Sequence, residues 1–594
     1  MKCLEYPFDP NYILEKKKKI RRELLEVGGP FIDKKIAILG GSTTNDIRLI
    51  LELFLLDQGI RPAFYESEYN RYYEDAMFPN PELEEFGPDV VYIHTTNRNI
   101  TAYPAPGDDE KAVENLLLTE YEKFRKMWDR IFEVYRCPVI QNDFEMPYFR
   151  LLGNRDAVDP RGRVHFLSEL NRKFFSYARD HENFHICDIN YLSADFGLKD
   201  WADPFYYHMY KYALSLPAIP YLAQNVANII KSLFGKNKKG LVLDLDNTLW
   251  GGVIGDDGVE NIELGPEEST GQAYSEFQEY LKQLKTLGIL LNIDSKNDPE
   301  NALAGLRHPD STLKEEDFIE IMANWEPKDQ NFRKIARELN LLPESLVFID
   351  DNPAERHIVR EQIKGVRAPE IGGIQDYIRV IDRSGFFEVT ALSGDDLKRS
   401  EMYAENAKRR AFEESFSDYR EYLVSLKMKA VIGAFEPLYM ARIAQLTNKS
   451  NQFNLTTKRY TQAEIEEAAK DPERVTLYGK LEDRFGDNGV VSVVIGHFSG
   501  GILKIELWLM SCRVLKRDME FAMMDALASE CLKRGIREIR GYYYPTPKNG
   551  MVRDFYAIMG FEKISGDDKG NTEWTFDLTK PYEKKNTVIE TADR

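Results

Sequence analysis

The sequence has 594 residues, of which 43% are hydrophobic and 12% aromatic, and its formal net charge is −19. This length exceeds what one hydrophobic core organises and predicts several domains, and the composition is that of a folded protein rather than a disordered one. The acidic balance argues against a nucleic-acid partner, which normally leaves a basic footprint on the protein that binds it.

Membrane insertion and secretion are not expected either. No apolar run approaches the ~20 residues that cross a bilayer, and the N-terminus lacks the apolar core of a signal peptide. The five cysteines are scattered and give neither a disulfide framework nor a zinc-ligand spacing. A protein of the reducing cytoplasm is therefore expected.

Residues 1–235 alternate short apolar runs with helical segments. The runs at 35–39, 89–94, 138–142 and 183–188 predict strands, and 46–57 and 112–135 predict helices. Strands that alternate with helices favour a parallel α/β sheet. The lysine-rich segment 234–239 predicts a linker to the next domain.

Residues 236–385 repeat this α/β pattern. The predicted strands are 240–244, 289–294, 318–323 and 345–350, and residues 272–287 place their apolar side chains on one helical face. Residues 386–430 are charged and helix-prone, which predicts a helical connector.

Residues 431–580 follow another pattern. Three consecutive strands are predicted at 475–482, 489–498 and 501–510, with Asn488-Gly489 and Gly500-Gly501 as hairpin turns between them. A helix at 518–533, a strand at 538–543, a helix at 548–559 and a strand at 573–578 follow. This order favours an α+β acyltransferase-like fold. Residues 581–594 are charged and predict a disordered tail.

The middle block places polar residues after strand ends or at a helix start. Two carboxylates at i and i+2 on a strand point to one side, and the carboxyl edge of a parallel sheet is where such folds bind ligands. Each residue alone is explained equally well as a helix cap, a turn or a solvated side chain, but the ordered set favours one shared site. In chain order these residues are Asp244, Asp246, Ser295, Lys328, Asp350 and Asp351.

The ordered set resembles the four motifs of the haloacid dehalogenase superfamily of phosphohydrolases, whose domains have a Rossmannoid parallel sheet. The resemblance implies that Asp244 is the nucleophile that attacks phosphorus and that Asp246 is the acid/base that protonates the leaving group. It also implies that Ser295 and Lys328 bind the phosphoryl oxygens. Attack by a carboxylate on an anionic phosphate needs compensating positive charge, which Lys328 and Mg²⁺ can supply.

The same resemblance implies a Mg²⁺ cofactor. Its ligands would be Asp244, Asp350 and the backbone carbonyl of Asp246, with Asp351 assisting. Mg²⁺ prefers carboxylates and retained water, which this oxygen-rich segment set offers. The substrate-binding residues implied by the motifs are Thr248, Asn297 and Asn352.

The segments 244–253, 295–298, 348–356 and 446–454 are similar to the FkbH-like subgroup of that superfamily, over about residues 30–580. Members of that group are described as glyceryl transferase/phosphatases that dephosphorylate 1,3-bisphosphoglycerate and load a glyceryl group onto an acyl carrier protein. The resemblance implies a phosphatase/acyl transferase for a small phosphorylated acid, with an acyl carrier protein as partner. Two alternatives stay open: a simple phosphatase of a phosphorylated metabolite in surface polysaccharide or secondary metabolite biosynthesis, and a non-catalytic scaffold.

Two positions bear on the transferase hypothesis, one where the family often has a cysteine and one where this chain has a cysteine. The family often has Cys immediately before Ser295, where this chain has Asp294. Cys512, in the family-like segment 510–515, is a candidate substitute as the acyl carrier. A small buried structural thiol is the equal alternative for Cys512.

The flanking blocks resemble the SGNH-hydrolase-like (flavodoxin-like) and GNAT-like domains of the same family. In the GNAT-like block, the loop 516–520 has no glycine and carries Asp518 and Glu520, which would repel a phosphate, so conventional coenzyme A binding is not expected. Asp518 is predicted as a helix N-cap. The domain would receive a carrier-protein arm or serve only as structure.

In the first block, a vestigial SGNH site would consist of Ser42, Asn97, Asp203 and His208. The Asp and His are five residues apart, whereas SGNH enzymes usually place them three apart. Ser42 as an ordinary helix cap is the alternative. We expect a degenerate hydrolase fold that acts as a substrate or carrier platform.

Overall fold

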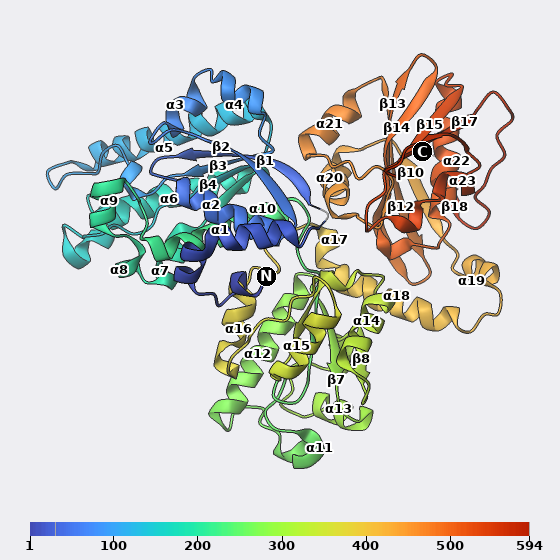
Figure 1. Ribbon diagram of the computed structural model, residues 1–594, viewed down its shortest axis with the longest axis horizontal. Coiled ribbons are helices and arrows are strands. Elements are labelled where there is room, and N and C mark those ends of the chain that lie inside the picture. The colour runs from blue at the N-terminus through green and yellow to red at the C-terminus, as the bar shows by residue number, and fades with distance from the viewer. Residues whose placement is uncertain (30, 593–594) are drawn as a thin grey trace. The chain divides into compact units, whose positions relative to one another are not determined.

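The computed structural model describes residues 1–29 and 31–592, and the chain divides into two compact units (Figure 1). Unit 1 comprises residues 1–236 with 388–391, and unit 2 comprises 237–387 with 392–594. The division after residue 236 lies one residue from the predicted boundary. The predicted middle and C-terminal domains lie in unit 2 apart from residue 236, and the predicted connector does so except for residues 388–391.

Unit 1 is built on a five-stranded parallel sheet in the order β2-β1-β3-β4-β5, the order of flavodoxin-like folds. Four of its strands were predicted. β2 was missed because it is an edge strand that contains Pro62 and is only partly buried, so it shows no continuous apolar run. The strands are β1 (Ile32–Gly40), β2 (Ile60–Glu66), β3 (Val90–His94), β4 (Val139–Asn142) and β5 (Phe184–Cys187).

The helices of unit 1 cover this sheet. α1, α2 and α10 pack on one another, and a core with Phe124, Trp128 and Phe174 joins α5 and α6 to the sheet. The helices are α1 (Pro10–Glu26), α2 (Asn45–Asp57), α3 (Tyr72–Met77), α4 (Pro81–Phe86), α5 (Glu110–Tyr135), α6 (Arg163–Asp180), α7 (Ile189–Phe196), α8 (Leu198–Trp201), α9 (Pro204–Tyr210) and α10 (Ile219–Leu233).

Unit 2 begins with a four-stranded parallel sheet in the order β8-β7-β6-β9, as predicted for this block. The strands are β6 (Gly240–Leu243), β7 (Leu290–Ser295), β8 (Glu320–Ala323) and β9 (Leu346–Ile349). The helices around them are α11 (Ile254–Asp257), α12 (Ser269–Thr286), α13 (Pro299–Leu306), α14 (Lys328–Glu338), α15 (Pro353–Gln362) and α16 (Ile374–Arg383). The connector is helical, as expected, with α17 (Gly394–Leu397), α18 (Arg399–Glu413) and α19 (Tyr419–Ser425).

The rest of unit 2 is a second, nine-stranded sheet. The order β16-β17-β15-β14-β13-β12-β10-β18, with β11 beside β14, contains the predicted antiparallel run β12-β13-β14. α22 connects β14 to the parallel strand β15, which gives the expected α+β acyltransferase-like arrangement. The strands are β10 (Lys429–Gly433), β11 (Phe453–Asn454), β12 (Arg474–Asp483), β13 (Gly486–Ser499), β14 (Ile502–Met510), β15 (Glu538–Tyr543), β16 (Glu562–Gly566), β17 (Thr572–Asp577) and β18 (Glu590–Ala592). The helices are α20 (Met440–Lys449), α21 (Gln462–Lys470), α22 (Met519–Lys533) and α23 (Phe555–Ile558).

Local details differ from the predictions in this sheet. The β12–β13 turn lies between the paired residues Asp483 and Gly486, so Asn488-Gly489 is inside β13 and not at the turn. Gly500 and Gly501, at φ 61° and 82°, do form the predicted β13–β14 turn. The helix predicted at 548–559 is reduced to α23 and a preceding 3-10 turn.

The predicted disordered tail is ordered through residue 592. Asp525 on α22 accepts hydrogen bonds from the Tyr582 hydroxyl at 2.6 Å and from the Lys585 amide at 2.8 Å. β18 then pairs in parallel with β10. Local composition does not reveal such a strand, because its partner lies about 160 residues earlier in the chain. Residues 593–594 of the predicted tail lie outside the described residues. In the part of the chain that the structure describes, no helix is both long and apolar enough to span a membrane.

Candidate functional site

The predicted polar residues of the middle block meet at one edge of the first sheet of unit 2. Asp244 directly follows the central strand β6, Ser295 ends the neighbouring β7, and Asp350 directly follows β9 on the other side. The amide of Asp244 donates to the carbonyl of Ile349 at 2.9 Å, which extends the β6–β9 ladder to the site. Because all three strands run parallel, their carboxyl ends share this edge.

Three carboxylates gather there around one ammonium group. Asp244, Asp350 and Asp351 each offer an oxygen, and these oxygens lie within 4.8 Å of one another. Lys328, the first residue of α14, is 3% exposed. Its Nζ lies 2.9 Å from Oδ1 of Asp244 and 2.5 Å from Oδ2 of Asp350. The cluster is therefore like-charged, buried at Asp244 and Asp350 and partly exposed at Asp351, and a single cation contacts the two buried carboxylates.

The crowding of carboxylates changes their proton affinities. Burial, together with the charge of Asp244, raises the pKa of Asp350 to about 6 and also raises the pKa of Asp351. Burial alone would lower the pKa of Lys328, but its contacts with Asp244 and Asp350 outweigh burial and raise it. One positive charge does not balance three carboxylates. A divalent cation with oxygen ligands, as Mg²⁺ prefers, fits this set of donors.

The carboxylate of Asp246 is not part of the three-carboxylate cluster and is held by other groups. Its Oδ1 accepts hydrogen bonds from Trp250 Nε1 at 2.9 Å and from the Ile254 amide at 3.2 Å, and its Oδ2 accepts from Asn297 Nδ2 at 3.0 Å. Burial, and secondarily the charge of Asp244, raise the pKa of Asp246. A raised pKa suits a group that must carry a proton to a leaving group. The metal role predicted for Asp246 rests on its backbone carbonyl, not on this side chain.

The remaining predicted residues divide by their contacts. Ser295 is 1% exposed, and its hydroxyl has no hydrogen-bond partner among the described residues. Thr248 Oγ1 accepts from the Asp351 amide at 3.3 Å, and the Asn352 side chain caps α15 by accepting from Ala354. Asn297 donates to Asp246, so all three predicted substrate-binding residues, Thr248, Asn297 and Asn352, hold neighbouring groups in place. The Ser295 hydroxyl, in contrast, remains available to a ligand.

Two residues of the site were not predicted to act there. Arg356 on α15 donates to the carbonyls of Asp350 and Asp351 at 2.6 and 2.7 Å and so fixes the turn that bears them. Its place in the first turn of α15, six residues after Asp350, is the only local sign of this role. Asp294, which replaces the family's cysteine, is fully buried, and Asn331 Nδ2 donates to its Oδ1 at 3.2 Å. Burial, reinforced by Asp244 and Asp350, raises the pKa of Asp294 far above its usual range.

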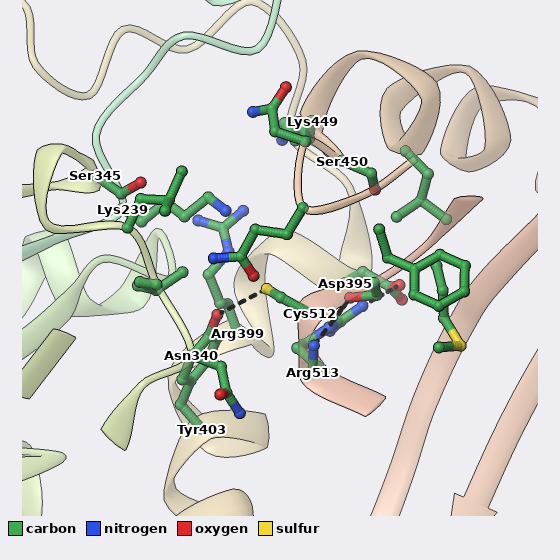
Figure 2. A pocket seen from close by; sticks show the side chains of 18 of the residues that line it. Lys239, Asn340, Ser345, Asp395, Arg399, Tyr403, Lys449, Ser450, Cys512 and Arg513 are labelled. Atoms are coloured by element: carbon green, nitrogen blue, oxygen red, sulfur yellow. Dashed lines mark hydrogen bonds and ion pairs between the residues drawn. The ribbon is translucent and has the colours of Figure 1, made fainter. Parts of the chain in front are cut away.

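Cys512 lies elsewhere in unit 2. It lines a cavity with Lys239 and Ser345, which precede β6 and β9, and its Sγ lies 3.6 Å from the Tyr403 hydroxyl (Figure 2). Lys239 and Asp244 are at opposite ends of β6, five residues or roughly 16 Å apart at about 3.3 Å per residue. The candidate acyl carrier and the carboxylate cluster therefore occupy opposite edges of the same sheet.

The start of α22 carries the acidic residues that the sequence analysis described as unfavourable for a phosphate. Arg517 is 7% exposed, and its guanidinium is held by Asp483 at 3.1 Å and Asn406 at 2.6 Å. Burial raises the pKa of Glu520 to about 7. Asp518 is the N-cap residue, as predicted, but at φ 59° its side chain makes no capping hydrogen bond. The Arg517 guanidinium is thus already held by other groups, and a coenzyme A pyrophosphate at this helix end would meet Asp518 and Glu520.

The vestigial SGNH site predicted in unit 1 lacks the contacts of a triad. Asp203 caps α9 by accepting from the Phe205 amide at 2.8 Å, and His208 is exposed on that helix. Among the described residues, no hydrogen bond joins Ser42, Asn97, Asp203 or His208 to another of the four. The alternative for Ser42 is also wrong: Thr44 is the N-cap of α2, while the Ser42 hydroxyl is buried without a partner in the described part of the chain.

Comparison with known proteins identifies a family match and a solved relative. The family model of the FkbH N-terminal domain matches residues 35–231. The N-terminal part of the Bacteroides fragilis protein BF1531, solved with its phosphatase domain complexed with Mg, is 30% identical, with a TM-score of 0.58 over 63% of this chain and 99% of that chain. The magnesium expectation agrees with that relative. A search of curated proteins gives no match.

Two further solved structures resemble a smaller part of the chain. The Escherichia coli ribosomal-protein-S18-alanine N-acetyltransferase is 10% identical over 27% of this chain and 99% of that chain, with a TM-score of 0.21. Ard1 of Thermoplasma volcanium is 22% identical over 25% of this chain and 94% of that chain, with a TM-score of 0.19. These two similarities are too weak to carry an argument, and the fold of this part of the chain is described by its strand order alone. By its matched domain and its Bacteroides relative, the chain belongs to the FkbH family and carries a phosphatase domain of the haloacid dehalogenase type.

Proposed function

We propose that the chain is a Mg²⁺-dependent phosphatase of a small phosphorylated acid and that it passes the resulting acyl group to an acyl carrier protein. The observation that carries the phosphatase part is the contact of Lys328 with both Asp244 and Asp350 beside Asp351. A scaffold without catalysis gains nothing from such a cluster, because buried like charges cost stability.

In the proposed reaction, a carboxylate oxygen of Asp244 attacks phosphorus, and the bond from phosphorus to the leaving oxygen breaks. Asp246 gives its proton to that oxygen, which the raised pKa of this carboxyl favours. Water then attacks the aspartyl-phosphate and loses a proton to Asp246, which releases phosphate and restores Asp244. Lys328 and the unpartnered Ser295 hydroxyl would bind the phosphoryl oxygens in both steps.

The metal would be held by Asp244, Asp350 and Asp351, with Arg356 fixing the turn of the last two. When bound, Mg²⁺ supplies positive charge that reduces the repulsion between Asp244 and the phosphate dianion. The reacting groups are deeply buried: Asp244 is 8% and Ser295 1% exposed. This burial favours a small substrate over a phosphorylated protein.

The finer proposal takes the substrate as 1,3-bisphosphoglycerate, by resemblance to the family. A carrier thiol attacks the acyl carbon, a carbon–sulfur bond forms, the bond from the acyl carbon to the phosphate oxygen breaks, and inorganic phosphate leaves with the proton of the thiol. The remaining phosphate ester is hydrolysed at Asp244. A relay through Cys512 would need the acyl group to travel between the two edges of the sheet, since Cys512 lies at the edge opposite Asp244. Direct attack by the carrier thiol is therefore the simpler route.

The test is incubation of the full chain with Mg²⁺, 1,3-bisphosphoglycerate and an acyl carrier protein in its phosphopantetheine form. The intact mass of the carrier and the released phosphate are measured together. A glyceryl adduct establishes the transferase, and its persistence in Cys512→Ser would exclude the relay. Phosphate release above spontaneous hydrolysis without an adduct leaves the simple phosphatase. If neither an adduct nor released phosphate is formed, both proposals are refuted.

A further inference from the structure

The cavity beside Cys512 is a second feature of unit 2 that the phosphatase chemistry does not use. It has a volume of about 90 Å³, and its wall comes from the segments preceding β6 and β9, from α18 and α20, and from the segment following β14 (Figure 2). Since one water needs about 10–15 Å³ in this measure, the cavity has room for a group of several heavy atoms. Residues that are far apart in the sequence, such as Lys239, Tyr403 and Cys512, share this wall.

The cavity wall is rich in cations. Its five basic residues face only two acidic ones, Asp395 and Asp396. Asp396 pairs with Lys449 at 3.0 Å and also with Arg399. Asp395 lies 2.9 Å from the Arg442 guanidinium and 3.7 Å from that of Arg513, as Figure 2 shows for Arg513. The five basic residues are Lys239, Arg399, Arg442, Lys449 and Arg513.

Lys239 is the cation without a counterion. Among the residues that the structure describes, its ammonium group has no hydrogen bond and no ion pair, and Figure 2 shows its side chain in the same wall as that of Arg399. Burial, with repulsion from Arg399 and Arg513, lowers the pKa of Lys239. Burial likewise lowers the pKa of Lys449 to about 8 and that of Arg442 to about 10. The wall thus holds more positive charge than its own carboxylates compensate.

We propose that this cavity is an anion site that binds the phosphoryl group of a small phosphate ester, with the Cys512 thiol beside it. An anion would supply the charge that Lys239 lacks, and arginine guanidinium groups match the oxygens of phosphate well. Tyr403 and Ser450 add hydroxyl groups to the wall, so the site offers neutral donors as well. The site is independent of the phosphatase centre, which lies at the other end of β6.

The rate at which the Cys512 thiol is alkylated can report on anion binding in the cavity. Cys512 and Cys3 are both partly exposed, whereas Cys137, Cys187 and Cys531 are buried. In the full chain, alkylation by anionic iodoacetate is compared with alkylation by neutral iodoacetamide, and each cysteine is quantified by peptide mass. We expect the ratio of the iodoacetate rate to the iodoacetamide rate to be about fivefold or more higher at Cys512 than at Cys3, because local positive charge concentrates the anionic reagent.

Competition then identifies the anion. Millimolar inorganic phosphate, at matched ionic strength, should slow alkylation of Cys512 several-fold and leave Cys3 unchanged, while acetate should protect neither. The ratio and the protection should both fall in Lys239→Gln and persist in Lys334→Gln, which removes a lysine on α14 that does not line the cavity.

Equal rate ratios at Cys512 and Cys3 without phosphate protection in the unaltered chain would overturn the proposal, and this arm needs no variant to fold. Protection by acetate as strong as that by phosphate would overturn the phosphoryl assignment. Undiminished protection in Lys239→Gln would overturn the role of the unpaired lysine.

Discussion

Nζ of Lys328 lies 2.9 Å from Oδ1 of Asp244, so the proposed nucleophile is paired with a buried cation. The same ammonium lies 2.5 Å from Asp350 and is 3% exposed. It therefore reduces the repulsion among the carboxylates and, at the same time, holds the oxygen that would attack phosphorus. Lys328 therefore stabilises the folded cluster before a metal binds.

Replacing Lys328 with Gln should make stability depend more strongly on Mg²⁺. Without the ammonium, three carboxylates lack their counterion, and the metal-free protein should lose roughly 3 kcal/mol of unfolding free energy. Because the variant lacks the positive charge of Lys328, the cluster is more negative and should bind a cation more strongly. Mg²⁺ should therefore raise the melting temperature of the variant more than that of the unaltered chain. Thermal unfolding in EDTA and in Mg²⁺ measures both effects.

The control for this prediction is Lys334→Gln, also on α14, where the lysine pairs with Glu326 and is 39% exposed. It should behave like the unaltered chain in both conditions. Equal Mg²⁺-induced shifts in Lys328→Gln and the unaltered chain would contradict the account of Lys328 as the counterion.

Asp244→Asn should lower phosphate release by at least about 10³-fold, because the amide is a far weaker nucleophile than the carboxylate. The shape of the side chain is nearly unchanged, so the fold should be kept, as circular dichroism can verify. Asp256→Asn, at an exposed position on α11, is the matched control and should release phosphate normally. Phosphate release by Asp244→Asn at the normal rate would refute the nucleophile assignment.

Glu145→Gln should remove a pH-dependent loss of stability from unit 1. Burial raises the pKa of Glu145 to about 7 from an ordinary value of 4.5. Between these two pH values the folded protein therefore keeps a proton on Glu145 that the unfolded chain has lost. This stability is complete below about pH 4.5 and is lost as the pH rises through 7. At about pH 8 the variant should therefore be more stable by roughly 1–3 kcal/mol.

The measurement is urea unfolding of Glu145→Gln and of the unaltered chain across this pH range, with the exposed Glu182→Gln as control. Other groups titrate in both proteins, so the difference between their curves isolates Glu145. A difference that does not change with pH would show that Glu145 is ionised in the folded protein.

Asp483→Asn should destabilise unit 2. The fully buried carboxylate accepts two hydrogen bonds at 2.8 Å from Arg409 and lies 3.1 Å from Arg517, and both guanidinium groups are largely buried. Removing its charge leaves the buried Arg517 without this ion pair and leaves Arg409 with only Glu405, at 3.4 Å, which should cost about 3 kcal/mol in urea unfolding. Asp487→Asn, at a side chain that is 58% exposed, should change the unfolding free energy by less than about 0.5 kcal/mol. A loss at Asp483 as small as that at Asp487 would show that water or another group compensates the arginines.

The sequence by itself predicted which residues of the middle block would meet at one edge of the sheet, where we propose the phosphatase site. Asp244, Ser295 and Asp350 each end or follow a short apolar run, and parallel strands place their carboxyl ends at one edge. Lys328 could be added because Pro327 marks the start of its helix. These inferences need only the local periodicity of strands and helices, together with a rule about parallel sheets.

Other features were settled only by the tertiary structure. The strand β18 exists because it pairs with β10. The carboxylate of Asp246 is bound by Trp250 and Asn297 and is not part of the three-carboxylate cluster. The position of Cys512 beside Lys239 joins residues 273 apart in the chain. Burial, unpaired charge and such long-range neighbours depend on how separate segments pack, and no local pattern of residue types encodes that packing.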